Sequence, residues 1–127
     1  MTAPATTTPA ATAAPVVRWQ ILSADPDATA RFYGRLFGWS VSQDNALGYR
    51  EVAAGDGGIG GGIWPAPPGV PPFVQLFTAV PDVAACVAEA ERLGAAVLVP
   101  PSALPDGDVM AVLRDPQGLP FAVCTLR

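Results

Sequence analysis

The chain contains an internal repeat, with matching positions 57 residues apart. Matched pairs include Arg18 with Gln75, Asp25 with Asp82, and Leu36 with Leu93. Self-similarity of this kind indicates two copies of one supersecondary unit. We therefore expect two similar modules related by a pseudo-two-fold axis, with a pocket shared between them.

The first copy has the pattern of one strand, one helix and three further strands. Residues 16–22 alternate, with Trp19 and Ile21 on one face and Arg18, Gln20 and Leu22 on the other. Asp25 and Pro26 are typical of a helix start, and Gly38 of a helix end. The predicted later strands are 39–43, 48–53 and 59–64, with a turn around residues 44–48.

The helix of the first copy has an apolar stripe. Ala28, Phe32 and Leu36 recur every four residues, with Thr29 and Tyr33 beside them. Such a stripe predicts that this side of the helix packs against the sheet.

The second copy repeats this plan after the proline-rich linker 65–72, which cannot join the interior of a sheet. The prediction is a strand at 73–79, a helix at 83–93 capped by Asp82, and strands at 95–99, 108–114 and 119–126. Val83, Cys86, Val87 and Ala90 are predicted to face inward. Residues 115–118 read as a hairpin turn. The fold class is α+β, with a βαβββ module at 16–64 and another at 73–127, in a single domain spanning 16–127.

Composition excludes several classes of partner and location. The seven basic residues are all Arg and are scattered, and the net charge is −4, so we expect no nucleic acid ligand. No apolar run is long enough to span a membrane. Residues 1–15 lack the features of a signal peptide and read as a flexible leader, so we expect a cytoplasmic protein. Cys86 and Cys124 are predicted to be small buried apolar residues, although a disulfide between them stays open.

The complete absence of histidine limits the chemistry of the predicted pocket. A Ser–His or Cys–His nucleophile is excluded. Residues 55–60 fit the pattern G-x-G-x-x-G, but the segment that follows cannot form the helix that a dinucleotide site needs. No cofactor is predicted.

Several short motifs together resemble the vicinal-oxygen-chelate superfamily of glyoxalases, bleomycin-resistance proteins and extradiol dioxygenases. They are Asp25 with residues 32–33 and 36–39, the strand 60–63, residues 80–83, residues 93–94, and the turn 115–118. The resemblance covers residues 16–127. It implies that the two modules form an open, cup-shaped mixed barrel, that the chain forms a homodimer, and that a ligand lies in the cup.

Metal-dependent members of that superfamily bring one ligand from each of four strands. Carried over by position, these places hold Arg18, Gln75, Ala122 and an apolar or glycine residue within 59–64. A divalent metal needs imidazole, carboxylate or thiolate donors, and a guanidinium would repel it. We therefore expect no metal.

The resemblance directs attention to a set of polar and aromatic residues as the ligand site. The predicted ligand-binding residues are Arg18, Gln20, Tyr49, Glu51, Trp64, Phe73, Gln75, Phe77, Met110 and Ala122. Alternatives stay open: Arg18 can form an internal pair with Glu51, Tyr49 and Glu51 can face solvent, and Trp64 and Phe73 can pack in a dimer interface.

An aromatic cup with a few polar anchors suits a flat, partly apolar organic molecule. The first hypothesis is a metal-independent small-molecule binder that sequesters a compound such as an antibiotic, and performs no catalysis. The second is a metal-independent isomerase, lyase or oxygenation accessory in secondary metabolism. A third is a module that regulates a partner protein, which an exposed apolar patch away from the cup would favour.

Overall fold

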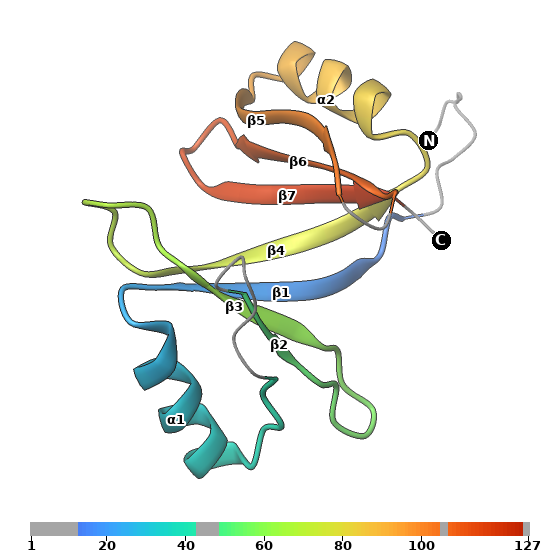
Figure 1. Cartoon of the computed structure of the whole chain (residues 1–127). Helices are drawn as coiled ribbons and strands as arrows, with labels where there is room; N and C mark the ends of the chain where they lie inside the picture. Colours follow the sequence, from blue (N-terminus) through green and yellow to red (C-terminus); the bar gives the residue numbers. More distant parts are fainter. Residues whose placement is uncertain (1–12, 43–48, 105–106, 126–127) are drawn as a thin grey trace, which may run out of the picture.

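The computed structural model describes residues 13–42, 49–104 and 107–125. The elements follow the predicted order with one strand fewer (Figure 1). They are β1 (Val16–Ser23), α1 (Pro26–Phe37), β2 (Arg50–Val52), β3 (Gly61–Pro65), β4 (Phe73–Val80), α2 (Val83–Arg92), β5 (Ala96–Ala103), β6 (Val109–Arg114) and β7 (Pro120–Thr125).

All seven strands belong to one open, mixed sheet with the order β2-β3-β1-β4-β7-β6-β5. The two modules meet edge to edge within the chain, because β1 pairs with β4 in antiparallel fashion. The α+β class and the tandem arrangement are confirmed.

The register of the β1–β4 pair reflects the 57-residue repeat. Trp19 lies opposite Leu76, and these residues are also 57 positions apart, so the pseudo-two-fold axis passes between them. Arg18 lies opposite Phe77, and Gln20 lies opposite Gln75. Because directly paired residues share a face of a sheet, these four side chains surround the axis on one face.

Both described helices pack on the other face. Trp19 stacks with Trp39, which in turn stacks with Tyr33 of α1. In the second module, Val83 and Val87 of α2 form a core with buried residues of β6 and β7. The face that carries Arg18, Gln20, Gln75 and Phe77 is called the helix-free face from here on.

The core of the second module is the one that the sequence predicts. Val83 and Val87 are buried, and Cys86 and Ala90 pack against the same cluster. Cys86 and Cys124 are both free and only partly buried, so the possibility of a disulfide between them is not realised. The 115–118 turn forms with the predicted geometry: Gly118 has a φ of 96° and donates to the Asp115 carbonyl at 2.8 Å.

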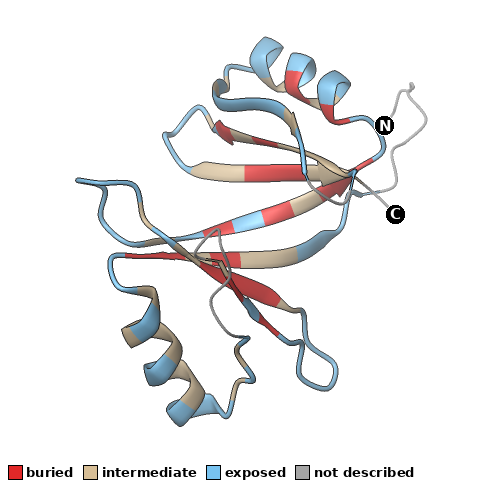
Figure 2. Ribbon diagram, viewed as in Figure 1, coloured by how far each residue is buried: buried red, intermediate tan, exposed pale blue. Residues whose placement is uncertain are grey.

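The predicted packing stripe of α1 is wrong at Phe32 and Leu36, whereas Ala28 is partly buried as predicted. Phe32 and Leu36 are each 58% exposed, and α1 has no buried residue (Figure 2). Thr29 and Tyr33, which flank the predicted stripe, are partly buried instead. The reason is rotation of the helix about its axis, which tertiary contacts fix and which four-residue periodicity leaves undetermined.

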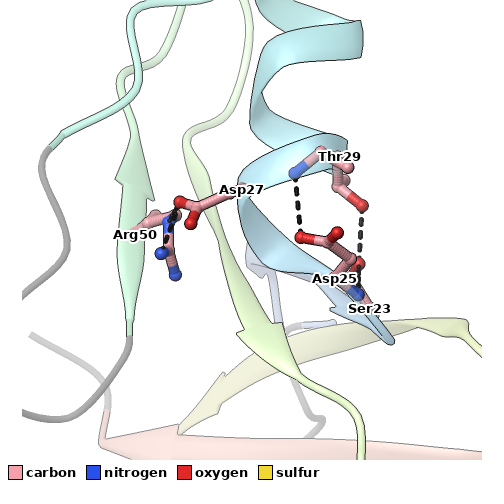
Figure 3. Close-up of polar contacts among 6 residues, drawn as sticks. Ser23, Asp25, Asp27, Thr29 and Arg50 are labelled. Carbon is pink, nitrogen blue, oxygen red and sulfur yellow. Dashed lines mark hydrogen bonds and ion pairs between the residues drawn. The ribbon is translucent and has the colours of Figure 1, made fainter.

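Polar contacts at its first turn hold α1 in this orientation (Figure 3). Asp27 accepts two hydrogen bonds from the buried Arg50 of β2, at 3.0 Å from Nε and 2.6 Å from Nη2. Asp25 caps the helix by accepting from the amide of Ala28 at 3.1 Å. The hydroxyls of Ser23 and Thr29 lie 2.6 Å apart. The Asp27–Arg50 pair therefore fixes which side of the helix faces the sheet.

The predicted strand at 39–43 is also wrong over the part that the structure describes. Residues 39–42 contribute an isolated antiparallel bridge between Val41 and Val52. Trp39 packs instead among the rings of Trp19, Tyr33 and Phe37, which takes it out of strand geometry. The leader 1–12 and the turn 44–48 lie outside the described residues. No helix of the described part is long and apolar enough to cross a membrane.

Candidate functional site

The helix-free face has two rows of neighbouring side chains across the centre of the sheet. Strand pairing places Glu51, Gly62, Gln20 and Gln75 in one row. It places Arg18, Phe77, Ala122, Val112 and Val99 in the other. Trp64, Leu22 and Phe73 extend the face at one end, and Cys124 with Met110 at the other. The fold thus brings nine of the ten sequence-predicted site residues together by register, and Tyr49 joins them by contact.

Arg18 is the cation at the centre of this face. Its guanidinium carbon lies 5.6 Å from the centre of the Tyr49 ring and 5.9 Å from that of Phe77. Such contacts stabilise a positive charge, but the rings offer no acceptor for in-plane N–H groups. Nε of Arg18 is buried and has no hydrogen-bond partner among the described residues.

Gln20 and Gln75 are the most deeply buried polar side chains of the face, at 8% and 6% exposure. Neither side chain forms a hydrogen bond with a residue that the structure describes. Among the described residues, their amide atoms are not fully buried polar atoms without partners, so they are open to the space over the sheet, and each amide can both donate and accept. The two amides therefore provide hydrogen-bonding capacity directed at the space over the sheet.

Aromatic rings wall this polar centre. Tyr49 precedes β2 and lies over Gly62, since a Cβ added there would overlap the Tyr49 ring. The Tyr49 and Trp64 rings are 4.8 Å apart. Glycine at position 62 is thus required by the close approach of Tyr49, which in turn contacts Arg18.

Sequence reasoning missed three residues of this face, Val99, Val112 and Cys124. Leu22 was placed on the face of Arg18 and Gln20 but was not counted among the ligand-binding residues. Two-residue alternation from Ala122 and Met110 was the available signal, but it identifies a shared face only when the pairing register is known. Burial raises the pKa of the Cys124 thiol, with a smaller lowering contribution from Arg18 and a raising one from Asp108. Cys124 is therefore a protonated thiol near Arg18 at neutral pH.

The internal Arg18–Glu51 pair does not form. Between described residues, the ion pairs are Arg50–Asp27 and Arg92–Glu89, and Glu51 is exposed. Glu51 thus leaves the charge of Arg18 uncompensated.

A separate open depression lies on α1, lined by Ala28, Arg31, Phe32, Arg35 and Leu36. It opens to solvent on the opposite side of the sheet from Arg18. It lacks the buried polar groups of the helix-free face, so the helix-free face is the stronger candidate for a ligand site.

The residues present do not fit a divalent metal. The places that the superfamily uses hold Arg18, Gln75, Ala122 and, on β3, Gly62, which provide one amide oxygen and no anionic donor. Within the described residues, no group of three or more His, Cys, Asp or Glu side chains could hold a metal ion. The chemistry of this donor set is that of hydrogen bonding to an organic molecule.

The chain belongs to the glyoxalase-like domain family, whose sequence profile matches residues 17–124. This places it in the vicinal-oxygen-chelate superfamily that the sequence motifs resemble.

Among curated proteins, the chain is 37% identical over 107 residues to "Putative glyoxylase CFP32" of Mycobacterium tuberculosis and of Mycobacterium bovis. The match covers 82% of this chain and 41% of the relative, so the chain spans less than half the length of these relatives.

Solved structures share the fold at low identity. A methylmalonyl-CoA epimerase in complex with methylmalonyl-CoA and NH4+ aligns with a TM-score of 0.63 at 22% identity, covering 88% of this chain and 94% of the other. Methylmalonyl-CoA epimerase from Mycobacterium tuberculosis aligns with a TM-score of 0.64 at 15% identity, covering 88% and 87%. At these identities the likeness shows the fold alone.

Proposed function

We propose that this protein binds an aromatic, partly apolar small molecule on the helix-free face and does so without a metal. One observation carries the proposal: Arg18, Gln20 and Gln75 converge there, and their side chains have no hydrogen-bond partner among the described residues. Tyr49, Trp64, Phe73 and Phe77 supply apolar walls. Few polar anchors within an aromatic surface are typical of small-molecule sites.

Sequestration is the form of binding that we favour, as in a drug-binding self-resistance protein that holds an antibiotic. The chain has no histidine, and burial keeps Cys124 in its protonated, weakly nucleophilic form. Among the described residues of the helix-free face, neither a histidine nor a reactive thiol is thus present to act in nucleophilic catalysis. Cytoplasmic location stays part of this proposal.

The second candidate is a metal-independent enzyme. Its support is that the relatives include proteins described as a glyoxylase and as methylmalonyl-CoA epimerases. Glu51 is the carboxylate of the Gln20–Gln75 row, so it is the candidate general base, with Tyr49 beside it. Catalytic activity that persists in the presence of a chelator and is lost in Glu51→Gln would favour this candidate over sequestration.

Quenching of tryptophan fluorescence tests the binding proposal, because Trp64 belongs to the helix-free face whereas Trp19 and Trp39 stack on the other face. A panel of aromatic natural products, including bleomycin-type, mitomycin-type and enediyne antibiotics, is titrated with and without chelator. We expect at least one compound to quench the wild type, and Trp64→Phe to remove most of that response. The matched control Trp39→Phe retains it. Absence of quenching across the panel would contradict the proposal.

A homodimer is the other part of the proposal, and the helix-bearing face offers a surface for it. Val74 and Leu76 of β4 are 57% and 49% exposed on that face, close to the pseudo-two-fold axis. Phe32 lies five residues after Asp27, roughly 140° around α1. Asp27 contacts β2, so Phe32 points away from that contact, and it is 58% exposed.

These exposed side chains, Phe32, Leu36, Val74 and Leu76, are called the apolar seam. Exposed apolar surface of this extent marks an interaction site. Val74 and Leu76 lie beside the pseudo-two-fold axis of the β1–β4 pair, a position that suits a second copy of this chain across a two-fold axis. The alternative is that the apolar seam binds a different, regulatory protein, which a monomeric wild type in analytical ultracentrifugation would favour.

A further inference from the structure

The charge on Arg18 has no counter-ion in the described part of the chain. A guanidinium is positively charged at neutral pH, and holding one at a partly dry site is unfavourable unless an anion compensates it. The ion pairs of the described residues use Asp27 and Glu89 on the other side of the sheet, not the helix-free face.

The neighbours of Arg18 on the helix-free face are uncharged. Phe77 and Ala122 follow it across the sheet, and Gln20 and Gln75 lie diagonally beside it. Two acidic residues lie on this side of the sheet: Glu51, which is exposed, and Asp108, whose charge reaches Cys124. Neither forms an ion pair with Arg18, so its direct neighbours among the described residues are amides and rings.

The accessible part of Arg18 is its terminal nitrogens. Nε is sealed from solvent, whereas the side chain as a whole is only partly buried, so the outer edge of the guanidinium faces the space over the sheet. The side-chain amides of Gln20 and Gln75 add N–H donors nearby. Converging donors around one positive charge are complementary to a planar anionic oxygen group.

We propose that the ligand is an organic anion, whose carboxylate, phenolate or enolate oxygen binds between Arg18, Gln20 and Gln75 while its flat conjugated body packs against Tyr49, Trp64 and Phe73. This inference rests on the proposed function and narrows it from any aromatic compound to an anionic one. In this superfamily a metal commonly faces the ligand oxygens; here a fixed guanidinium takes that position.

Two probes of nearly identical shape separate charge from shape: 2-naphthoate and its neutral amide, 2-naphthamide. Their dissociation constants are measured by isothermal titration calorimetry at pH 7. We expect the wild type to bind 2-naphthoate about 10- to 100-fold more tightly, since charge-assisted hydrogen bonds contribute that much. Raising the salt concentration from 50 to 500 mM should narrow this preference.

Three variants assign the preference to Arg18. Arg18→Gln is expected to abolish the preference for the anion, and Arg18→Lys to retain part of it. Arg92→Gln, an exposed arginine on α2, is the matched control and leaves both constants unchanged. If Arg18→Gln fails to fold, as circular dichroism would show, the affinities of the wild type for the two probes still test whether the site prefers an anion.

The possible failures are distinguishable. Equal affinity of the wild type for the two probes would overturn the anion inference and leave the proposed function standing. A preference that survives in a folded Arg18→Gln variant would overturn the role of Arg18. Failure of the wild type to bind either probe would contradict the proposed function and this inference with it.

Discussion

Gln20 and Gln75 lie directly opposite each other across the β1–β4 pair, although the repeat makes Gln75 the equivalent of Arg18. Each glutamine thus faces the other in the strand pair, while its equivalent position in the repeat holds a different residue. The result is that two amides, one guanidinium and one phenyl ring surround the pseudo-two-fold axis on a single face. Positions that are equivalent by the repeat therefore carry different side chains: Arg18 corresponds to Gln75, and Gln20 corresponds to Phe77.

Replacing Gln75 with leucine should separate stability from binding. Gln75 is 6% exposed, but its amide atoms are not among the fully buried polar atoms of the described residues that lack a partner, so Gln75→Leu should change the free energy of unfolding by less than about 1 kcal/mol. Affinity for any ligand of the helix-free face should fall at least tenfold. Urea unfolding and calorimetry measure the two effects, with the exposed Gln117→Leu as control. A variant that lost both stability and binding would show that Gln75 is structural.

Introducing a methyl group at Gly62 should displace Tyr49. An added Cβ would overlap its ring, so Gly62→Ala should destabilise the fold by about 1–3 kcal/mol, as overpacking typically does. It should also weaken ligand binding, because Tyr49 contacts Arg18. Gly55→Ala meets open space and should change the free energy of unfolding by under about 0.5 kcal/mol. Equal effects of the two substitutions would argue against a tight Gly62–Tyr49 contact.

The two helix caps are equivalent by the repeat and should have similar energetic weight. Asp25 accepts from the Ala28 amide at 3.1 Å, and Asp82 accepts from the Ala85 amide at 3.0 Å. Asp25→Ala and Asp82→Ala should each reduce the free energy of unfolding by about 0.5–2 kcal/mol. The exposed loop substitution Asp56→Ala should have no effect in the same denaturation assay. A loss confined to one cap would mean that the modules do not unfold together.

The Cys124 thiol should report on Arg18 through its pH dependence. Burial raises the pKa of this thiol, so at pH 8 a smaller fraction is thiolate than in an unstructured peptide, and alkylation by iodoacetamide is slower. Arg18 lowers the pKa, and removing its charge in Arg18→Gln should therefore move the midpoint of the rate profile to higher pH. The measurement uses a Cys86→Ala background. A midpoint that moves to lower pH would contradict this placement of Arg18.

A charge in the apolar seam should disrupt the proposed homodimer. Leu76 is 49% exposed beside the pseudo-two-fold axis, so Leu76→Asp would bury two carboxylates across a symmetric interface. Analytical ultracentrifugation should show a dimer for the wild type and a monomer for this variant. Leu119, exposed at the β6–β7 turn, supplies the control Leu119→Asp, which stays dimeric. A monomeric wild type would overturn the dimer and leave the seam for a different partner.

Local sequence patterns sufficed for most of the fold. Asp25, Pro26 and Gly38 set the ends of α1, Asp82 sets the start of α2, and Asp115 with Gly118 makes the last hairpin. These signals are reliable because capping and turn formation are satisfied by residues close in the chain. The predicted strand at 39–43 failed where the signal was weakest, since edge strands depend on partners elsewhere.

The candidate site was reached from the repeat and the two-residue alternation of β1 and β4. Arg18, Gln20, Gln75 and Phe77 could be assigned to one face from sequence, because alternation fixes a face within a strand. Which strands lie side by side is a matter of register, so Val99, Val112 and Cys124 were missed. The α1 stripe was misassigned for a related reason, because helical periodicity defines a face without saying what it touches.

The sequence by itself determined that this chain has two related modules and carries no histidine or carboxylate at Arg18, Gln75 and Ala122, since both follow from which residues are present and how they repeat. Only the tertiary structure decided that the Arg18 charge has no counter-ion in the described part of the chain and that Phe32 and Leu36 face away from the sheet. The physical reason is that charge compensation and burial depend on neighbours contributed by strands far apart in the chain. No local pattern records those neighbours.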